Sequence, residues 1–197
     1  LADAGYAGMG IDDVARADRA EVFQRVVDKV VASSIPDHLP APEAMALDAT
    51  ALESWGIGRR RHAAPEAPAN PDERDAEPDQ AEPGVRSYDP DARWGYRTKT
   101  YDNRTNYCFG YDLFAMVAVP LASADPLSMP KLTHRLVVRP SGLDVVEPAV
   151  TMLDDLTRAG TSITELLNDR AWSYKTADRW ADPLRERGIS QIFDLHP

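Results

Sequence analysis

Two aspartates stand in segments that are otherwise apolar, and this setting makes them the first candidates for chemistry. Asp48 lies within residues 45–52, and Asp169 ends residues 163–169. A carboxylate buried without a partner is costly, so such groups are usually hydrogen-bonded, paired, protonated or bound to a metal. An aspartate at the end of a strand is also commonly a helix cap or a turn former, and this alternative stands for each residue alone.

Metal binding would explain the two aspartates together. If their segments form neighbouring strands, the carboxylates of Asp48 and Asp169 converge on a hard cation such as Mg²⁺ or Mn²⁺, which prefers oxygen ligands. Two such ions about 3.5 to 4 Å apart would activate an attacking oxygen and stabilise the leaving oxygen of a phosphoryl transfer. The pair therefore predicts a metal site for phosphoryl transfer.

Strands must position both aspartates. A proline and a glycine bound the run at 45–52, which is too short for a buried helix and favours a central strand. Residues 163–169 predict a strand whose polar end is Asp169, a position that often faces a ligand in mixed α/β sheets. Further strands are expected at 93–101, 107–119, 132–138 and 191–195, the first two joined into a hairpin by a turn at 102–106.

Helices complete the predicted fold. Apolar residues recur at helical spacing in 11–32 and in 145–156, where Pro148 is acceptable in the first turn. A short helix is expected over 182–188, with Asp182 as its cap. The order of the elements predicts an α/β fold in which helices pack on the faces of a mixed sheet.

Length and composition indicate a soluble protein with one domain that has a full core, or with one domain plus helical appendages. The chain has 197 residues, 43% of them hydrophobic, and no apolar run approaches the roughly 20 residues that cross a bilayer. The single cysteine, Cys108, cannot form an internal disulfide, which fits a reducing compartment. The opening residues show no secretory signal. We therefore expect a cytoplasmic protein without a membrane partner.

The net charge of -10 is unevenly distributed. Residues 63–91 hold nine acids and two bases, and the rest of the chain is close to neutral. Residues 62–87 are rich in Pro, Ala, Glu and Asp and have too little apolar surface to offset the entropy of ordering, so we expect a disordered insertion there. A negative total charge therefore counts only weakly against a nucleic-acid partner.

Basic residues cluster on the expected hairpin, and they are the candidates for DNA contact: Arg93, Arg97, Lys99 and Arg104. Phosphate binding and a solvated hairpin face explain this cluster about equally well. The aromatic residues interleaved with it are expected to pack rather than to stack on bases, namely Trp94, Tyr96 and Tyr101.

Four short motifs follow one another along the chain. They are LDAT at 47–50, YDPDARWG at 88–95, FGY at 109–111 and NDRAW at 168–172. Their order and spacing resemble the DDE-type transposases of bacterial insertion sequences, over about 44–197. In that family the first strand carries an Asp followed by a small residue and Thr, and an Asp-Pro-Asp-Ala segment leads into a hairpin that ends in Gly-Tyr. A later strand ends in Asp-Arg and an aromatic residue.

The resemblance implies an RNase H-like core at 43–197, incomplete at its C-terminus, after an N-terminal helical segment at 1–42. Asp48 then matches the first catalytic carboxylate and Asp169 the second, with Mg²⁺ or Mn²⁺ as the cofactor. The third acid, a Glu on a later helix, would lie beyond Pro197. Transposon-end DNA is the implied partner, with a homodimer on DNA as one assembly. Asp112 departs from the family, which often has a basic residue there.

Three functional hypotheses remain at this point. The first is a transposase fragment that contributes to metal-dependent DNA cleavage and joining but is inactive alone. Within the same fold, a nuclease or a decayed transposase is the alternative. A non-enzymatic binding module, with structural aspartates and an acidic segment that recruits a basic partner, is the alternative from another class.

Overall fold

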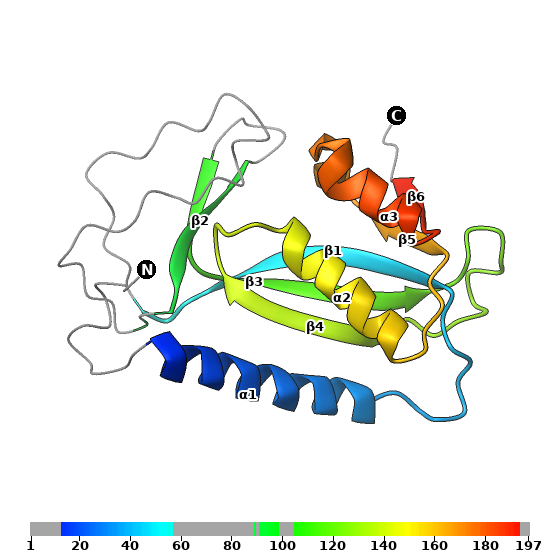
Figure 1. The fold of residues 1–197 in the computed structure, drawn as a ribbon, viewed down its shortest axis with the longest axis horizontal. Helices are drawn as coiled ribbons and strands as arrows, with labels where there is room; N and C mark the ends of the chain where they lie inside the picture. Colours follow the sequence, from blue (N-terminus) through cyan, green and yellow to red (C-terminus); the bar gives the residue numbers. More distant parts are fainter. Residues whose placement is uncertain (1–12, 57–88, 90, 99–104, 194–197) are drawn as a thin grey trace. The chain divides into compact units, whose positions relative to one another are not determined.

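The computed structural model describes residues 13–56, 89, 91–98 and 105–193 (Figure 1). The helices and strands, in chain order, are α1 (Asp13–Ser33), β1 (Ala44–Glu53), β2 (Arg93–Thr98), β3 (Thr105–Val119), β4 (Thr133–Pro140), α2 (Val146–Arg158), β5 (Glu165–Asn168), η2 (Arg170–Tyr174), η3 (Ala177–Ala181), α3 (Asp182–Glu186) and β6 (Ser190–Phe193). This order confirms the predicted succession of helices and strands. The expected insertion at 62–87 lies outside the described residues.

The described strands form a mixed sheet. The hydrogen-bonded order is β2-β3-β1-β5-β6, and β4 pairs with β3 beside this path. β5 runs parallel to β1 and to β6, whereas β2 and β3 are antiparallel. The predicted hairpin and the predicted mixed α/β fold class are therefore confirmed.

The chain divides into two compact units. One unit comprises Leu1–Val26, Thr50–Leu113 and Val138–Leu143, and the other Val27–Ala49, Phe114–Val137 and Asp144–Pro197, each through its described residues. We call them unit 1 and unit 2. Asp48 and Asp169 both belong to unit 2, so one compact body carries the candidate site.

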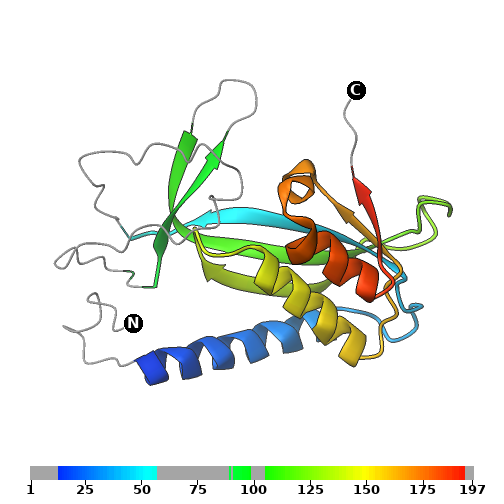
Figure 2. The same cartoon turned by 45° about the horizontal axis from the view of Figure 1, so that its top comes forward.

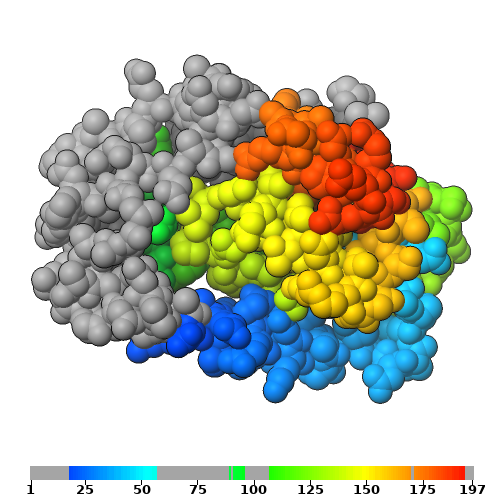
Figure 3. Space-filling view, viewed as in Figure 1, coloured from blue at the N-terminus to red at the C-terminus, as the bar shows by residue number. Residues whose placement is uncertain are grey.

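The hydrophobic core of unit 2 lies between its strands and the helices α2 and α3 (Figures 1 and 2). Alternate residues of β1 and β3, and one residue of β5, point into it, as strand geometry requires. Those strand residues are Met45, Leu47, Phe114, Met116, Ala118 and Leu166. Figure 3 shows α2 and the segment from η2 to α3 side by side on this face.

Helix α2 begins and ends where its sequence allows. Pro148 lies in the first turn, where its missing N–H costs no helical hydrogen bond, and its side chain is buried. The backbone N–H of Val146 donates to Oδ1 of Asp144 at 2.9 Å. Gly160 follows the helix with a φ of 95°, a conformation that glycine adopts without strain.

The entry to α3 differs from the expectation. The N-cap is Ala181, without a side-chain hydrogen bond, and Asp182 is already helical. The reason is the π-helical turn η3, which delivers the chain to α3 in a helical conformation, so that no extended capping residue is needed. Periodicity did not predict this turn, because a single π turn is too short to show a period.

Candidate functional site

The residues that directly precede Asp48 and Asp169 pair with each other on two adjacent strands. The parallel register of β1 and β5 pairs Leu47 with Asn168, and the two aspartates are the next residues of the chain. Neighbouring strands lie about 4.8 Å apart, so the two backbones place the aspartates close together. The predicted adjacency of the two segments is confirmed.

Both aspartates project away from the core. Leu47 and Asn168 are buried at 3% and 6% exposure, and successive strand residues alternate between faces. Asp48 and Asp169 are accordingly exposed. The expectation that they are buried carboxylates is therefore wrong, because each lies one position out of phase with the core-facing residues. Because both carboxylates are exposed, burial does not favour a bound metal here. The candidate metal site rests on the closeness of Asp48 to Asp169.

Each carboxylate has a backbone partner. Oδ1 of Asp48 accepts from the N–H of Ala49 at 2.8 Å. Asp169 is the N-cap of η2, and its Oδ1 accepts from the N–H of Ala171 at 2.9 Å. The capping role weighed from the sequence is thus present at Asp169. In both residues the bond engages Oδ1, and a hard cation could be bound through Oδ2.

The donor set fits a cation that keeps much of its water. Two exposed carboxylates supply oxygen ligands of the kind that Mg²⁺ and Mn²⁺ accept, and Mg²⁺ is usually bound through one or two carboxylates. In the part of the chain that the structure describes, no three His, Cys, Asp or Glu side chains gather as a metal-binding group. Asp48 and Asp169 would therefore be the protein ligands, with the remaining positions open to water or phosphate.

An oxygen-rich cluster in unit 1 was missed by sequence reasoning. Asp89 accepts hydrogen bonds from the Ser54 hydroxyl at 2.5 Å and from the Tyr111 hydroxyl at 2.6 Å. The backbone N–H of Gly56 donates to the Ser54 hydroxyl at 3.0 Å. Asp89 and Tyr111 belong to two of the sequence motifs, but only the fold brings them together. With both carboxylate oxygens engaged, Asp89 has a structural role in linking Ser54 to Tyr111.

Asp112 also has a structural contact in unit 1. Its Oδ1 accepts from the hydroxyl of Ser141 at 3.3 Å. Ser141 lies in a turn after β4 and is buried at 1% exposure. A Cβ on Gly95 would lie 2.8 Å from Cβ of Ser141, which explains the glycine of that motif.

The predicted basic cluster is described only in part. Arg93 is half-buried on β2, opposite Gly110 of β3. Arg97 pairs with Asn106 through the register of the hairpin, and Lys99 and Arg104 lie outside the described residues. Their contact with DNA stays a prediction.

The aromatic side chains differ in their packing. The ring centroids of Trp94 and Phe109 are 5.4 Å apart, which confirms a packing role for Trp94. Trp172, three residues after Asp169, is buried at 5% exposure. Tyr174, which ends the short η2 turn, is 54% exposed and so is not part of the core that holds Trp172.

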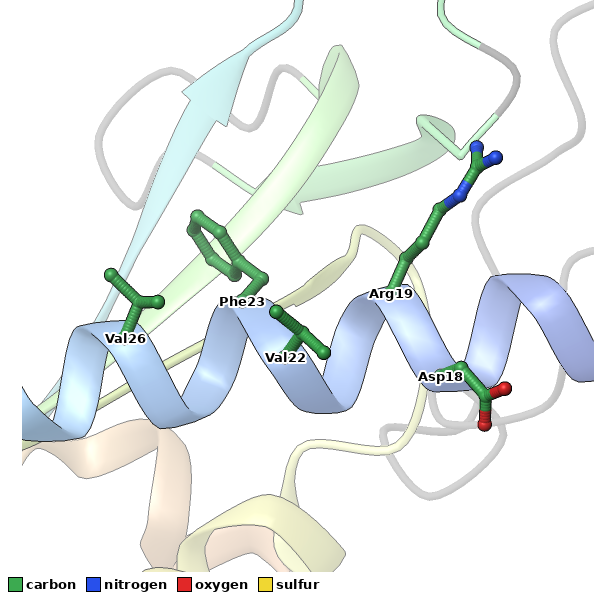
Figure 4. A pocket seen from close by; sticks show the side chains of 5 residues that line it. All are labelled: Asp18, Arg19, Val22, Phe23 and Val26. Atoms are coloured by element: carbon green, nitrogen blue, oxygen red, sulfur yellow. The ribbon is translucent and has the colours of Figure 1, made fainter.

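An apolar hollow lies on α1, apart from these residues (Figure 4). It is lined by Asp18, Arg19, Val22, Phe23 and Val26. The three apolar side chains are 51%, 53% and 55% exposed. In Figure 4, Phe23 and Val26 leave the helix on the same side as Arg19. Among the residues that the structure describes, no candidate for metal or DNA contact lines this hollow.

No protein-family model matches the chain, and no curated protein matches its sequence. In the described residues, no helix has the length and hydropathy needed to cross a bilayer.

Proposed function

We propose that this chain is part of the catalytic core of a DDE-type DNA transposase, with an RNase H-like fold. The observation that carries the proposal is the parallel pairing of Leu47 with Asn168, which brings Asp48 and Asp169 to neighbouring positions. Two motifs far apart in the sequence thereby converge, as the transposase resemblance requires. DNA is the proposed substrate and Mg²⁺ or Mn²⁺ the proposed cofactor.

The arrangement of the strands supports the proposed fold. The central strand β1 has β3 on one side and β5 on the other; β2 and β4 both pair with β3, and β6 lies beyond β5. Helix α2 connects β4 to β5, and α3 lies between β5 and β6. Asp48 is thus on the middle strand, and Asp169 is at the carboxyl end of its parallel neighbour, where ligands of α/β sheets often bind.

The residues of this site would hold and orient a cation. When bound, such an ion stabilises the negative charge that develops on the phosphate oxygens and lowers the pKa of an attacking water. Asp48 is supported by a strand, and Asp169 by its cap on η2. Both supports limit the movement of the carboxylates, which matters because binding and chemistry depend on ligand position.

The test is cation binding by the two aspartates. Mn²⁺ should broaden the NMR signals of Asp48, Asp169 and their neighbours selectively in the wild-type chain. Asp48→Asn and Asp169→Asn should each abolish this broadening, because they remove a charge while preserving an oxygen for the local backbone bond. Asp37→Asn, at an exposed position, is the matched control and should change nothing.

A binding module with structural aspartates remains the alternative, because both carboxylates accept local backbone hydrogen bonds. Asn caps helices about as well as Asp, whereas Ala does not. If Asp169→Ala destabilises the fold and neither Asn variant alters Mn²⁺ broadening, the structural alternative is correct and the transposase proposal fails.

A further inference from the structure

Two tryptophans pack against each other in the segment that follows Asp169. Trp172 lies in η2 and Trp180 in η3, and their ring centroids are 4.4 Å apart with an interplanar angle of 34°. Their exposures are 5% and 1%. Both belong to the core of unit 2, so this pair fixes an otherwise short and irregular segment to the body of the unit.

The backbone connects Trp172 to Asp169 within one turn. The N–H of Trp172 donates to the carbonyl oxygen of Asp169 at 3.3 Å, and the N–H of Ala171 donates to the Asp169 carboxylate at 2.9 Å. The Asp169 side chain keeps the rotamer that accepts this bond from Ala171 only while the η2 turn stays in place. Because η2 is a five-residue 3-10 turn with little stability of its own, its place depends on the burial of Trp172.

Trp180 is held from two directions. The π turn directs its ring into the core, where its N–H donates to no partner among the described residues. The adjacent Arg179 forms an ion pair with Asp144 at 2.7 Å, and Asp144 also accepts from the first residue of α2. The ring against which Trp172 packs is therefore anchored independently of Asp169.

We propose that Trp180 is a positioning residue, which acts through Trp172 to fix the rotamer of the Asp169 carboxylate. The effect of this rotamer on cation affinity rests on the proposed function, but the positioning itself does not. Residues that orient metal ligands typically change metal affinity by about 10- to 100-fold when substituted. Loss of the stacked ring should therefore weaken cation binding without removing any ligand.

The experiment compares Trp180→Leu with Trp180→Phe and Leu184→Ala. Leu184 is also fully buried in the core, on α3, and serves as the control for a general loss of packing. All variants are studied at a temperature where circular dichroism shows each one fully folded. NMR couplings report the χ1 rotamer of Asp169, the amide order parameter reports the Ala171 bond, and titration with Mn²⁺ reports affinity.

Trp180→Leu should average the Asp169 rotamer, lower the order parameter of Ala171 and weaken Mn²⁺ binding by about tenfold. Trp180→Phe keeps an aromatic ring and should restore all three, and Leu184→Ala should leave them near wild type. The positioning role of Trp180 is overturned if Trp180→Leu and Leu184→Ala change the Asp169 rotamer equally, or if neither changes it. If the wild type shows no Mn²⁺ binding, the proposed function fails, while the rotamer and order parameter still decide the inference.

Discussion

Gly110 of β3 lies directly against the carbonyl oxygen of Leu52 in β1: a Cβ on this glycine would come within 2.0 Å of that oxygen. It would also lie 2.8 Å from the backbone nitrogen of Ser54, which donates to Phe109 at 2.9 Å. Backbone atoms cannot give way as a flexible side chain can. Any side chain at this position must therefore separate the two strands locally.

Gly110→Ala is expected to destabilise unit 1 by about 1 to 3 kcal/mol or more, as overpacking does. Chemical denaturation followed by tryptophan fluorescence measures the change in the free energy of unfolding. Gly160→Ala is the control, because its Cβ would meet nothing within 4 Å and only the φ of 95° is unfavourable. Its cost should be near 1 kcal/mol. A Gly110→Ala variant as stable as the wild type would contradict the close approach.

Arg135 of β4 connects two helices of unit 2 through their carboxylates. Its guanidinium lies 2.7 Å from Asp28 of α1 and 2.5 Å from Asp155 of α2, and all three side chains are at least 73% buried. Arg135→Met leaves two partly buried carboxylates without this partner, and we expect a loss of roughly 2 to 3 kcal/mol. Thermal and denaturant unfolding provide the measurement.

The matching control for Arg135 neutralises the carboxylates as well. Adding Asp28→Asn and Asp155→Asn to Arg135→Met should recover part of the lost stability, because no partly buried carboxylate is then left without Arg135. Arg158, which also pairs with Asp155 at 2.6 Å, is 74% exposed and loses little with that partner. Asp28→Asn and Asp155→Asn are also measured singly in the wild type. If together they lower the stability of Arg135→Met by the sum of these two single losses, the three residues are not coupled.

Arg187 and Asp154 form a bidentate ion pair that gives the stability of unit 2 a pH dependence. Nε of Arg187 lies 2.8 Å from Oδ1 of Asp154, and its terminal nitrogen lies 3.0 Å from Oδ2. The hydrogen bonds from Arg187 hold the pKa of Asp154 below its usual value. The folded state therefore binds this proton less readily than the unfolded state, so the pair stabilises the fold above pH about 4 and loses its effect at lower pH.

The prediction is that Asp154→Asn costs up to about 1 kcal/mol near neutral pH, since the pair is partly exposed and screened by solvent. The difference from wild type should shrink as pH falls below about 4, first because the unfolded chain takes up the proton there and then, at lower pH, because the folded carboxylate is protonated as well. Urea denaturation from pH 7 to pH 3 measures this. A difference that stays constant over that range would show that the carboxylate charge contributes nothing.

DNA cleavage by the 197-residue chain alone should be very weak even with Mg²⁺ or Mn²⁺. Under the proposed function a third acid is needed to fix both ions, and a positional error of about 1 Å can cost on the order of a hundredfold in rate. Nicking of a supercoiled plasmid is the assay. Efficient nicking that is abolished by Asp169→Ala would mean that an acid within this chain, such as Glu186, completes the site.

The sequence predicted the order of elements because the apolar pattern of each strand and helix is local. It also predicted the adjacency of the strands that precede Asp48 and Asp169. It could not predict their exposure, because an apolar run does not reveal which residues of a strand face the core. Which alternate residues face the core is set by how the strands pair and pack, and here Leu47 and Asn168 take the buried positions.

The contacts of Asp89 were also beyond prediction from sequence. Its partners Ser54 and Tyr111 are 35 and 22 residues away along the chain, and hydroxyl groups show no periodic pattern. The same holds for the packing of Trp172 on Trp180, which depends on a π turn that no propensity indicates.

That π turn makes the segment after Asp169 sensitive to chain length. η3 continues directly into α3, so deleting one residue between Ala177 and Ala181 would leave a regular helical path into α3. Each helical residue is rotated by about 100° from the last, so everything before the deletion would turn by that angle relative to α3. A deletion at Asp178 or Arg179 that appears harmless to the helix would therefore turn Trp172 and Asp169 relative to Trp180, and insertions or deletions at these five positions should be among the least tolerated in unit 2.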